Sequence, residues 1–209
     1  MSKPTVFTSE QLREHLKSSV SERRYLHSLG VAKTAGEVLE HFGCRDYTKS
    51  WNGFSAPEFC GLAHDLAREM SDACILEYCR ENNIFLSKED IEAPVLAHGV
   101  VSADMAVELV GRYPMSWYKA LCVHTTGNAG MDDLALALFI ADYIEPTRKF
   151  MTAEKRSFYL GSENISQCAY RVLCDMIDHW RQTGFHDASS GSMAMKEYLE
   201  RNAHCTYRG

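Results

Sequence analysis

The sequence lacks several features that would place the protein in a membrane or outside the cell. The 209-residue chain has no apolar stretch approaching the roughly 20 residues that a membrane-crossing helix needs. Residues 1–10 lack the apolar core of a secretory signal peptide. No two of the eight cysteines are spaced as C-x-x-C, which argues against a zinc ribbon or a thioredoxin-like motif. We therefore expect a cytoplasmic protein with reduced thiols and no membrane partner.

Positive charge is also in deficit. The chain has 22 Lys and Arg residues against 28 Asp and Glu residues, a formal net charge of −6. Binding to DNA or RNA depends on an excess of cations, so we predict no nucleic-acid partner. A small anionic ligand stays compatible with this composition, because it requires only a local cluster of cations.

Alternating apolar and polar residues, the pattern of a β-strand, are scarce, and we find no repeat or low-complexity tract. Apolar residues recur instead at helical spacing. The pattern predicts an all-α protein with one compact domain, held together by helix packing. We also expect a loop over 46–56, anchored by Trp51 and Phe54, and a linker over 87–91. The predicted helices span residues 8–16, 21–42, 57–67, 70–82, 101–113, 116–125, 131–144, 162–184 and 192–202.

The stretch Gly61-Leu62-Ala63-His64-Asp65 places an imidazole beside a carboxylate after an apolar run. Adjacent helical side chains point about 100° apart, so His64 and Asp65 can border one cavity. A carboxylate next to an imidazole suits a divalent transition metal. A lone pair of this kind is more commonly two solvated residues at the end of a helix, so the interpretation depends on the rest of the chain.

Four more residues join this pair: His27, His98, His124 and Asp142. Asp142 is the most informative, because a carboxylate in an apolar helix is costly unless it is paired or binds a cation. Pairing with an arginine such as Arg148 is one alternative; for His27 a core position is another, and for His124 a helix cap. Only the ordered set, each member in or beside an apolar helix, favours a metal site. We predict solvated or structural roles for the remaining histidines, His15, His41, His179, His186 and His204.

This ordered set resembles the HD superfamily of metal-dependent phosphohydrolases, and in particular its YqeK family. The resemblance covers about residues 20–200. It rests on the strings RRYLHSLGVAKTA, GLAHDLAREMS, AHGVVSADMA, HTTGNAGMDDLALALFIADYIEPTR and TGFHDASSGSMAMKEYL. It implies the HD-domain helical fold. We predict an N-terminal helical extension over 1–20, a phosphohydrolase core over 21–150, and helices over 151–209 that complete the domain.

The proteins of this family are symmetrical bis(5′-nucleosyl)-tetraphosphatases, so the resemblance implies metal-dependent cleavage of diadenosine tetraphosphate into two ADP. Two metal ions bridged by Asp65 and a water would generate hydroxide near neutral pH. Iron is the implied metal and manganese the alternative; imidazole and carboxylate ligands suit both. The implied ligands of the first metal are His27, His64, Asp65 and Asp142, and those of the second are His98, His124 and Asp65.

A phosphorus under attack gathers negative charge and needs cations or hydrogen-bond donors nearby. Thr126 and the glycine-rich turn after it offer hydrogen-bond donors of this kind. For each arginine near the centre, the alternative role is that of an ordinary surface charge. Where the family usually has Lys, this chain has Arg68, a planar fork in place of a point charge. The predicted catalytic residues are His64, Asp65 and Arg68. The predicted substrate-binding residues are Arg24, Asp65, His98, His124, Thr125 and Arg148.

Three alternatives to this function are compatible with parts of the sequence pattern. The first is an HD phosphohydrolase that acts on nucleoside monophosphates or cyclic dinucleotides. The second is a non-catalytic regulator that binds a nucleotide or metal, and the third is a helical interaction module in which the histidines never converge. The full set of six ligands favours an active enzyme. We expect a dinucleoside polyphosphate as substrate and ADP as product, with a homodimer as an alternative to the monomer.

Overall fold

The computed structural model of the chain describes residues 6–44, 50–183 and 189–203. Within these ranges it contains α-helices, one short 3₁₀ helix and an isolated bridge between Trp51 and Phe54, but no strand. The prediction of an all-α protein is confirmed. Loop residues 46–49, His186 and His204 lie outside the described residues. The elements are α1 (Ser9–Ser19), α2 (Glu22–His41), α3 (Ala56–Ala63), α4 (Asp72–Glu81), α5 (Lys88–Glu92), η1 (Pro94–Ala97), α6 (His98–Val110), α7 (Met115–Val123), α8 (Asp133–Ile144), α9 (Ala153–Leu160), α10 (Ile165–Thr183) and α11 (Ser190–Ala203).

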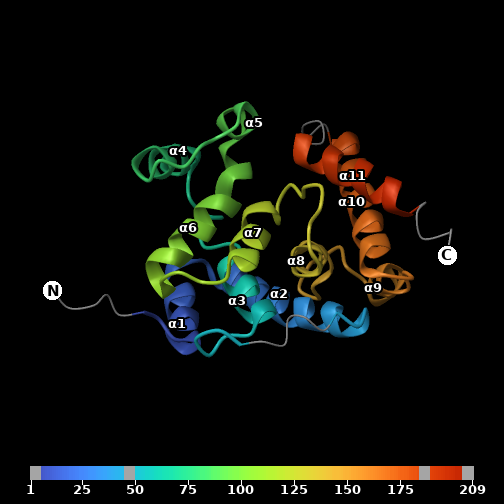
Figure 1. The fold of residues 1–209 in the computed structure, drawn as a ribbon, viewed down its shortest axis with the longest axis horizontal. Helices are drawn as coiled ribbons and strands as arrows, with labels where there is room; N and C mark the ends of the chain where they lie inside the picture. The colour runs from blue at the N-terminus through green and yellow to red at the C-terminus, as the bar shows by residue number, and fades with distance from the viewer. Residues whose placement is uncertain (1–5, 45–49, 184–188, 204–209) are drawn as a thin grey trace.

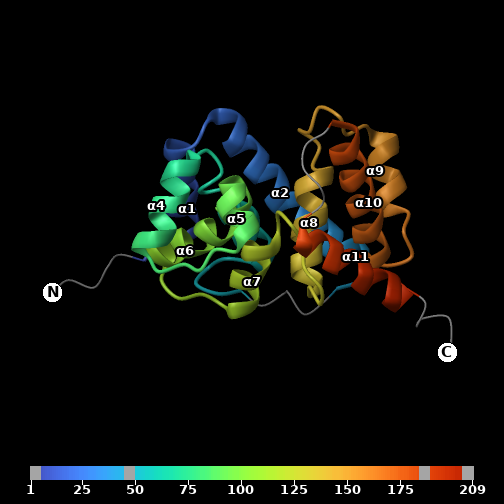
Figure 2. The same ribbon diagram turned by 90° about the horizontal axis from the view of Figure 1, so that it is seen from above.

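Helix α8 lies at the centre of the fold. All of its residues from Leu134 to Ala141 are buried, as expected for a helix that is apolar on every side. It packs against α2, α3, α7 and α10. Both ribbon views show α8 with α9, α10 and α11 on one side and α6 and α7 on the other (Figures 1 and 2). Figure 1 shows α3 on the same side as α6 and α7. Side chains near its C-terminal end therefore face several other helices.

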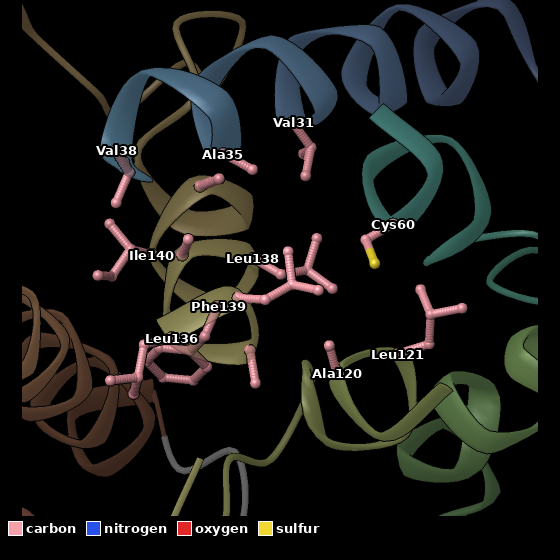
Figure 3. Close-up of a cluster of buried hydrophobic side chains, with 14 of the residues drawn as sticks. Val31, Ala35, Val38, Cys60, Ala120, Leu121, Leu136, Leu138, Phe139 and Ile140 are labelled. Carbon is pink, nitrogen blue, oxygen red and sulfur yellow. The ribbon is translucent and has the colours of Figure 1, made fainter. Parts of the chain in front are cut away.

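The main core lies between α2 and α8. Figure 3 shows Val31, Ala35 and Val38 of α2 facing the side chains of α8, with residues of α3 and α7 at one end of the cluster. Each fully buried large apolar side chain stabilises the fold by about 1.5–3 kcal/mol relative to an exposed one. Helices α2 and α3 also approach very closely, because a Cβ at Gly61 would overlap the Cα and N of Ala32.

Two predicted helices differ clearly from their expected bounds. The helix predicted over 101–113 is α6, which begins at His98 and ends at Val110, where Gly111 caps it with a positive φ of 77°. The pattern predicted a helix over 57–67, but α3 ends at Ala63 and His64 is its C-cap. The His64 Nδ1 donates to the Gly61 carbonyl at 2.8 Å, the carbonyl that the Asp65 N–H would need in a longer helix. The chain continues in tighter turns, with Arg68 N donating to the Asp65 carbonyl at 3.1 Å.

Two α-helices, and the 3₁₀ helix η1, were not predicted. Helix α9 falls where the sequence analysis assigned no element, although Thr152 caps it by accepting from the Lys155 N–H. The expected linker over 87–91 contains the short helix α5, which begins with a capping box between Ser87 and Asp90. Both are short helices, for which apolar periodicity is a weak signal.

The outer helices attach to the core through few partners. Helix α1 packs on α2 and α3, and α9 and α11 pack on α10. Helix α9 also meets α8 through the rings of Tyr159 and Tyr143. The division of the chain at residues 20 and 150 stays a prediction. Among the described helices, none combines the length and apolar character required to span a membrane.

Candidate metal centre

Three of the predicted histidines occupy the same local position. His64, His98 and His124 each follow directly after the last residue of a helix, respectively α3, η1 and α7. Each ring Nδ1 donates to the backbone carbonyl three residues earlier. Because a carbonyl can only accept, each Nδ1 carries a proton, and each Nε2 faces the other ligands of the centre. The accepting carbonyls belong to Gly61 (2.8 Å), Val95 (2.6 Å) and Leu121 (2.7 Å).

His27 and Asp142 come from inside helices. His27 is buried in the first half of α2, and its Nε2 lies 2.9 Å from Asp142 Oδ1 in the last turn of α8. Pro146 cannot donate to the Asp142 carbonyl, and the Arg148 Nε does so instead at 2.8 Å. Arg148 Nη2 also contacts Asp142 Oδ1 at 2.5 Å. Asp142 therefore has both partners that the sequence offered as alternatives, a histidine and an arginine.

The buried carboxylate of Asp65 lies between two groups of histidines. Its Oδ2 is 3.2 Å from His64 Nε2 and 3.6 Å from His27 Nε2. Its Oδ1 is 3.2 Å from His98 Nε2 and 3.9 Å from His124 Nε2. The two oxygens of one carboxylate thus face opposite groups, a geometry suited to bridging two cations.

The donor atoms fit a metal centre. The Nε2 atoms of His27 and His64 lie 3.3 Å apart, and those of His98 and His124 lie 3.1 Å apart. In neutral rings whose Nδ1 atoms carry the proton, these are facing lone pairs, which repel unless a cation lies beside them. Two sets of ligand atoms each lie within 4.8 Å of one another: His27, His64 and Asp142, and His64, Asp65 and His124.

Both carboxylates are held ionised. Burial alone would raise the pKa of Asp65, but the charge and hydrogen bonds of His64 and His98 outweigh it and hold the pKa well below its usual range. Burial likewise opposes ionisation of Asp142, yet the Arg148 guanidinium lowers the pKa of that group. Ionised carboxylates are the form that binds a metal ion.

The histidines differ in their tendency to take up a proton. Burial, and after it the charge of His98, lowers the pKa of His124 to about 3. Burial also opposes a proton on His27, but hydrogen bonds to Asp142 and Glu145 outweigh it, so the pKa of His27 is raised. A site that favours a proton on one ring through nearby carboxylates would favour a metal cation there for the same reason.

The predicted substrate-binding groups lie around this centre, whereas Arg68, predicted as catalytic, does not. Arg24 contacts Asp65 Oδ2 through its Nη1. Thr125 Oγ1 lies 3.2 Å from His98 Nε2 and 3.3 Å from the Nε2 of His124. Arg68 is half-buried, and with the described residues its side chain forms no hydrogen bond or ion pair. Nothing in the structure brings Arg68 into the centre.

Beside the centre lies a cavity that the sequence pattern did not predict. It has a volume of about 190 Å³ and lies between the C-terminal half of α8, the following loop and α10. His179, predicted to be solvated or structural, is exposed at this cavity. The wall is largely aromatic, a feature that helical periodicity alone does not reveal. The lining residues are His124, Phe139, Asp142, Tyr143, Arg148, Phe150, Met176, His179 and Trp180.

Helix α11 was predicted without a role, and it docks beside His124. The Ser192 hydroxyl donates to the Thr126 carbonyl at 2.7 Å, and buried Met195 packs against Gly127. The tail therefore supports the turn that carries Thr125. Ser192 also lies in one of the strings that carry the family resemblance, which was the available signal.

Several known proteins are similar to this chain. The symmetrical bis(5′-nucleosyl)-tetraphosphatase of Halalkalibacterium halodurans is 32% identical over 142 residues, which cover 67% of this chain and 70% of that protein. The protein of the same name from Bacillus subtilis is 30% identical over 141 residues, covering 65% and 68%. No protein-family model matches the chain.

The fold of this chain is similar to that of a protein from Clostridium acetobutylicum, known from a crystal structure. That protein is described as a predicted HD superfamily hydrolase involved in NAD metabolism. It matches with a TM-score of 0.82 at 25% identity, over 95% of this chain and 100% of that chain. The predicted HD fold and family resemblance are confirmed: the chain belongs to the family of symmetrical bis(5′-nucleosyl)-tetraphosphatases, hydrolases of the HD superfamily.

Proposed function

We propose that the protein hydrolyses diadenosine tetraphosphate symmetrically, giving two ADP, at a centre that holds two metal ions. The observation that carries the proposal is the position of Asp65, whose two oxygens face separate groups of histidines. The names of the curated relatives support the substrate. The aromatic cavity next to Asp142 supports a ligand that contains a nucleoside.

The ligands divide between two positions in this proposal. His27, His64 and Asp142 would hold one metal with Asp65 Oδ2, while His98 and His124 would hold the other with Asp65 Oδ1. Bound metals would supply positive charge opposite the phosphate oxygens and lower the pKa of an attacking water. Imidazole and carboxylate donors, with no thiolate in either set of ligand atoms, suit iron, which we propose, and also manganese.

Symmetrical cleavage divides the tetraphosphate between its second and third phosphorus atoms. The oxygen of water forms a bond to one of these, and the bond from that phosphorus to the bridging oxygen breaks. The bridging oxygen leaves with the other half and the protons of water pass to the products and the solvent, so each product carries two phosphates. In this proposal Asp65, ionised and buried, would orient the water and accept a hydrogen bond from it.

The residues around the centre have matching roles in substrate binding. Arg148 lines the cavity and reaches Asp142, so its guanidinium would hold a phosphate oxygen between the centre and the nucleoside. Thr125 would donate its hydroxyl on the opposite side, next to His98 and His124. Rings such as Tyr143 would stack on the base, because every nucleobase presents a π-face to an aromatic side chain.

The substitution Asp65→Ala tests the proposal. We expect elemental analysis to find two metal ions in the native protein and fewer in Asp65→Ala. We also expect the native protein to release ADP as the sole nucleotide product, and Asp65→Ala to lose turnover. Asp178→Ala, on the exposed face of α10, is the matched control and should retain both properties. Retention of both metals and of turnover in Asp65→Ala would overturn the assignment.

The same assay separates the alternatives. Turnover of nucleoside monophosphates or cyclic dinucleotides in preference to diadenosine tetraphosphate would indicate a different HD phosphohydrolase. Binding of metal and nucleotide without turnover would indicate a regulator. A cytoplasmic location and a homodimer stay predictions from the sequence.

A further inference from the structure

The imidazole of His27 is held differently from the other three of the centre. His64, His98 and His124 each use a backbone carbonyl three residues earlier. His27 lies inside α2, where the carbonyls of the preceding turn accept helical N–H groups. Its Nδ1 donates instead to Glu145 Oε1 at 2.9 Å. Only this ring is therefore oriented by a charged group.

The Glu145 side chain is completely buried, and both of its carboxylate oxygens accept hydrogen bonds. Its exposed fraction is 0%, a position that is costly for a carboxylate without partners. The Thr147 N–H donates to Oε2 at 2.7 Å and the Thr147 hydroxyl to Oε1 at 2.6 Å. Pro146 restricts the residue before it to extended backbone, and Glu145 has φ −61° and ψ 144° as the C-cap of α8. The carboxylate is thus fixed by local chain geometry.

Helix α2 leaves room for this carboxylate. Gly30 lies three residues after His27, on the same face of the helix. A Cβ at Gly30 would lie 2.6 Å from Glu145 Oε2 and 3.3 Å from its Cδ. Any larger residue at position 30 would push the carboxylate away from His27. The fit of Glu145 against α2 therefore has two independent parts, the hydrogen bond to His27 and the space at Gly30.

We propose that Glu145 is a positioning residue that fixes the ring of His27 so that its Nε2 faces the metal centre. The inference rests on the proposed function, in which His27 binds a metal. A carboxylate that accepts from the far nitrogen of a metal-binding histidine sets its tautomer and ring orientation and raises its basicity. Of the two metal positions, only the one that contains His27 and Asp142 has this support.

The first test compares Glu145→Gln with the native protein, using Mn²⁺ as the probe. Glutamine keeps the size and an acceptor oxygen but removes the charge. In competition with a fluorescent chelator, we expect one of two Mn²⁺ ions to bind about 10–100-fold more weakly, while the affinity of the other stays unchanged. Glu154→Gln, which removes a fully exposed carboxylate, is the control and should leave both affinities unchanged.

The second test moves the carboxylate without replacing it. Gly30→Ala should weaken the same Mn²⁺ ion. Gly36→Ala should not, because it places the same methyl group on the same helix at an ordinary distance of 3.8 Å from Pro57 Cγ. Histidine-selective ¹⁵N NMR of the full-length native chain should also show the proton of His27 on Nδ1. This spectroscopic measurement needs no variant, so it stays decisive even if Glu145→Gln fails to fold.

The outcomes separate this inference from the proposed function. If Glu145 had a purely structural role, Glu145→Gln would lower the unfolding free energy of chelator-treated protein and leave both Mn²⁺ affinities unchanged. Unchanged Mn²⁺ affinities in both Glu145→Gln and Gly30→Ala would overturn the positioning role alone. A His27 ring that carries its proton on Nε2 and none on Nδ1 would overturn it as well. A native protein that binds no Mn²⁺ and no iron would overturn both proposals.

Discussion

The close approach of α2 and α3 at Gly61 gives a prediction with a definite sign. Gly61 of α3 is helical, and helix propensity alone would favour alanine there by about 1 kcal/mol. The added Cβ would overlap the backbone of Ala32 and lie 2.6 Å from the Ala32 Cβ. Non-bonded carbon atoms prefer about 3.5–4.0 Å, so α2 and α3 would have to separate by about 1 Å.

The expected magnitude follows from these two opposing effects. Overpacking a tight core costs about 1–3 kcal/mol and occasionally more. The neighbour of Gly61 is backbone, which cannot rotate away as a side chain can, so the cost should lie at the upper end. After the gain in propensity, we expect Gly61→Ala to lower the unfolding free energy by about 2 kcal/mol. For a chain of this size, that corresponds to a fall in Tm of about 4–8 °C.

Gly36→Ala provides a matched comparison. Gly36 lies within α2, and a Cβ there would lie 3.8 Å from Pro57 Cγ, an ordinary contact. The propensity gain is then unopposed. We expect the unfolding free energy to rise by up to about 1 kcal/mol and Tm by about 2–4 °C. The same chemical change should thus destabilise at one site and stabilise at the other.

Thermal and denaturant unfolding of both variants should be measured with a chelator present, because a bound metal adds its own stabilisation. Shifts in opposite directions are expected. If Gly61→Ala were as stable as Gly36→Ala, the inference of a rigid close approach would be wrong. The site offers a second readout, since His27 and His64, whose Nε2 atoms lie 3.3 Å apart, sit on these two helices. Metal affinity should fall in Gly61→Ala and persist in Gly36→Ala.

Two other predictions concern charge and hydrogen bonding at the C-terminal helices. Burial alone would raise the pKa of Asp175, but its contact with Lys155 Nζ at 2.7 Å outweighs it and the pKa is lowered from 3.8 to about 2. Its carboxylate therefore stabilises the fold above about pH 4, and this stabilisation is lost as the pH falls toward 2. Asp175→Asn should lower the unfolding free energy at neutral pH and flatten the acid limb of a stability–pH curve. An unchanged acid limb would contradict this. Ser192→Ala leaves the Thr126 carbonyl without its donor at a buried position, so denaturant unfolding should show a loss of about 1–3 kcal/mol, whereas exposed Ser190→Ala should cost less.

Much of the local structure could be predicted from the sequence, because its causes are local. Thr8 begins α1 with a capping box, as its spacing to Gln11 allows. Ser21 and Ser71 cap α2 and α4 through their side-chain oxygens, and serine is a residue type that N-cap positions favour. The ordered set of histidines and aspartates was also visible, since each member interrupts or ends an apolar run.

The features that were missed depend on which helices face each other. Met176 and Trp180 have ordinary helical spacing in α10, and only the packing of α10 on α8 brings them to a cavity beside Asp142. Glu145 could have been found, since the cost of burying a carboxylate applies to it as it does to Asp142. Its partner His27 lies 118 residues away in the sequence, so the role of Glu145 emerged only from tertiary structure.

The centre requires that each histidine ring is oriented within its own turn and that the turns lie at the right distance from one another. The first requirement is local in the sequence and the second is long-range. Each cap histidine is oriented by its own turn through the carbonyl three residues before it. That geometry says nothing about the distance between turns. The distance between two turns depends on glycine positions. A Cβ at Gly99 would lie 2.8 Å from the Leu121 carbonyl oxygen and 3.2 Å from His124 Nδ1. The hydrogen bond between these two atoms orients the His124 ring. A substitution at Gly99 should therefore disturb His124 while leaving His98 in its own turn, because the first requirement is set within each turn and the second is set between them.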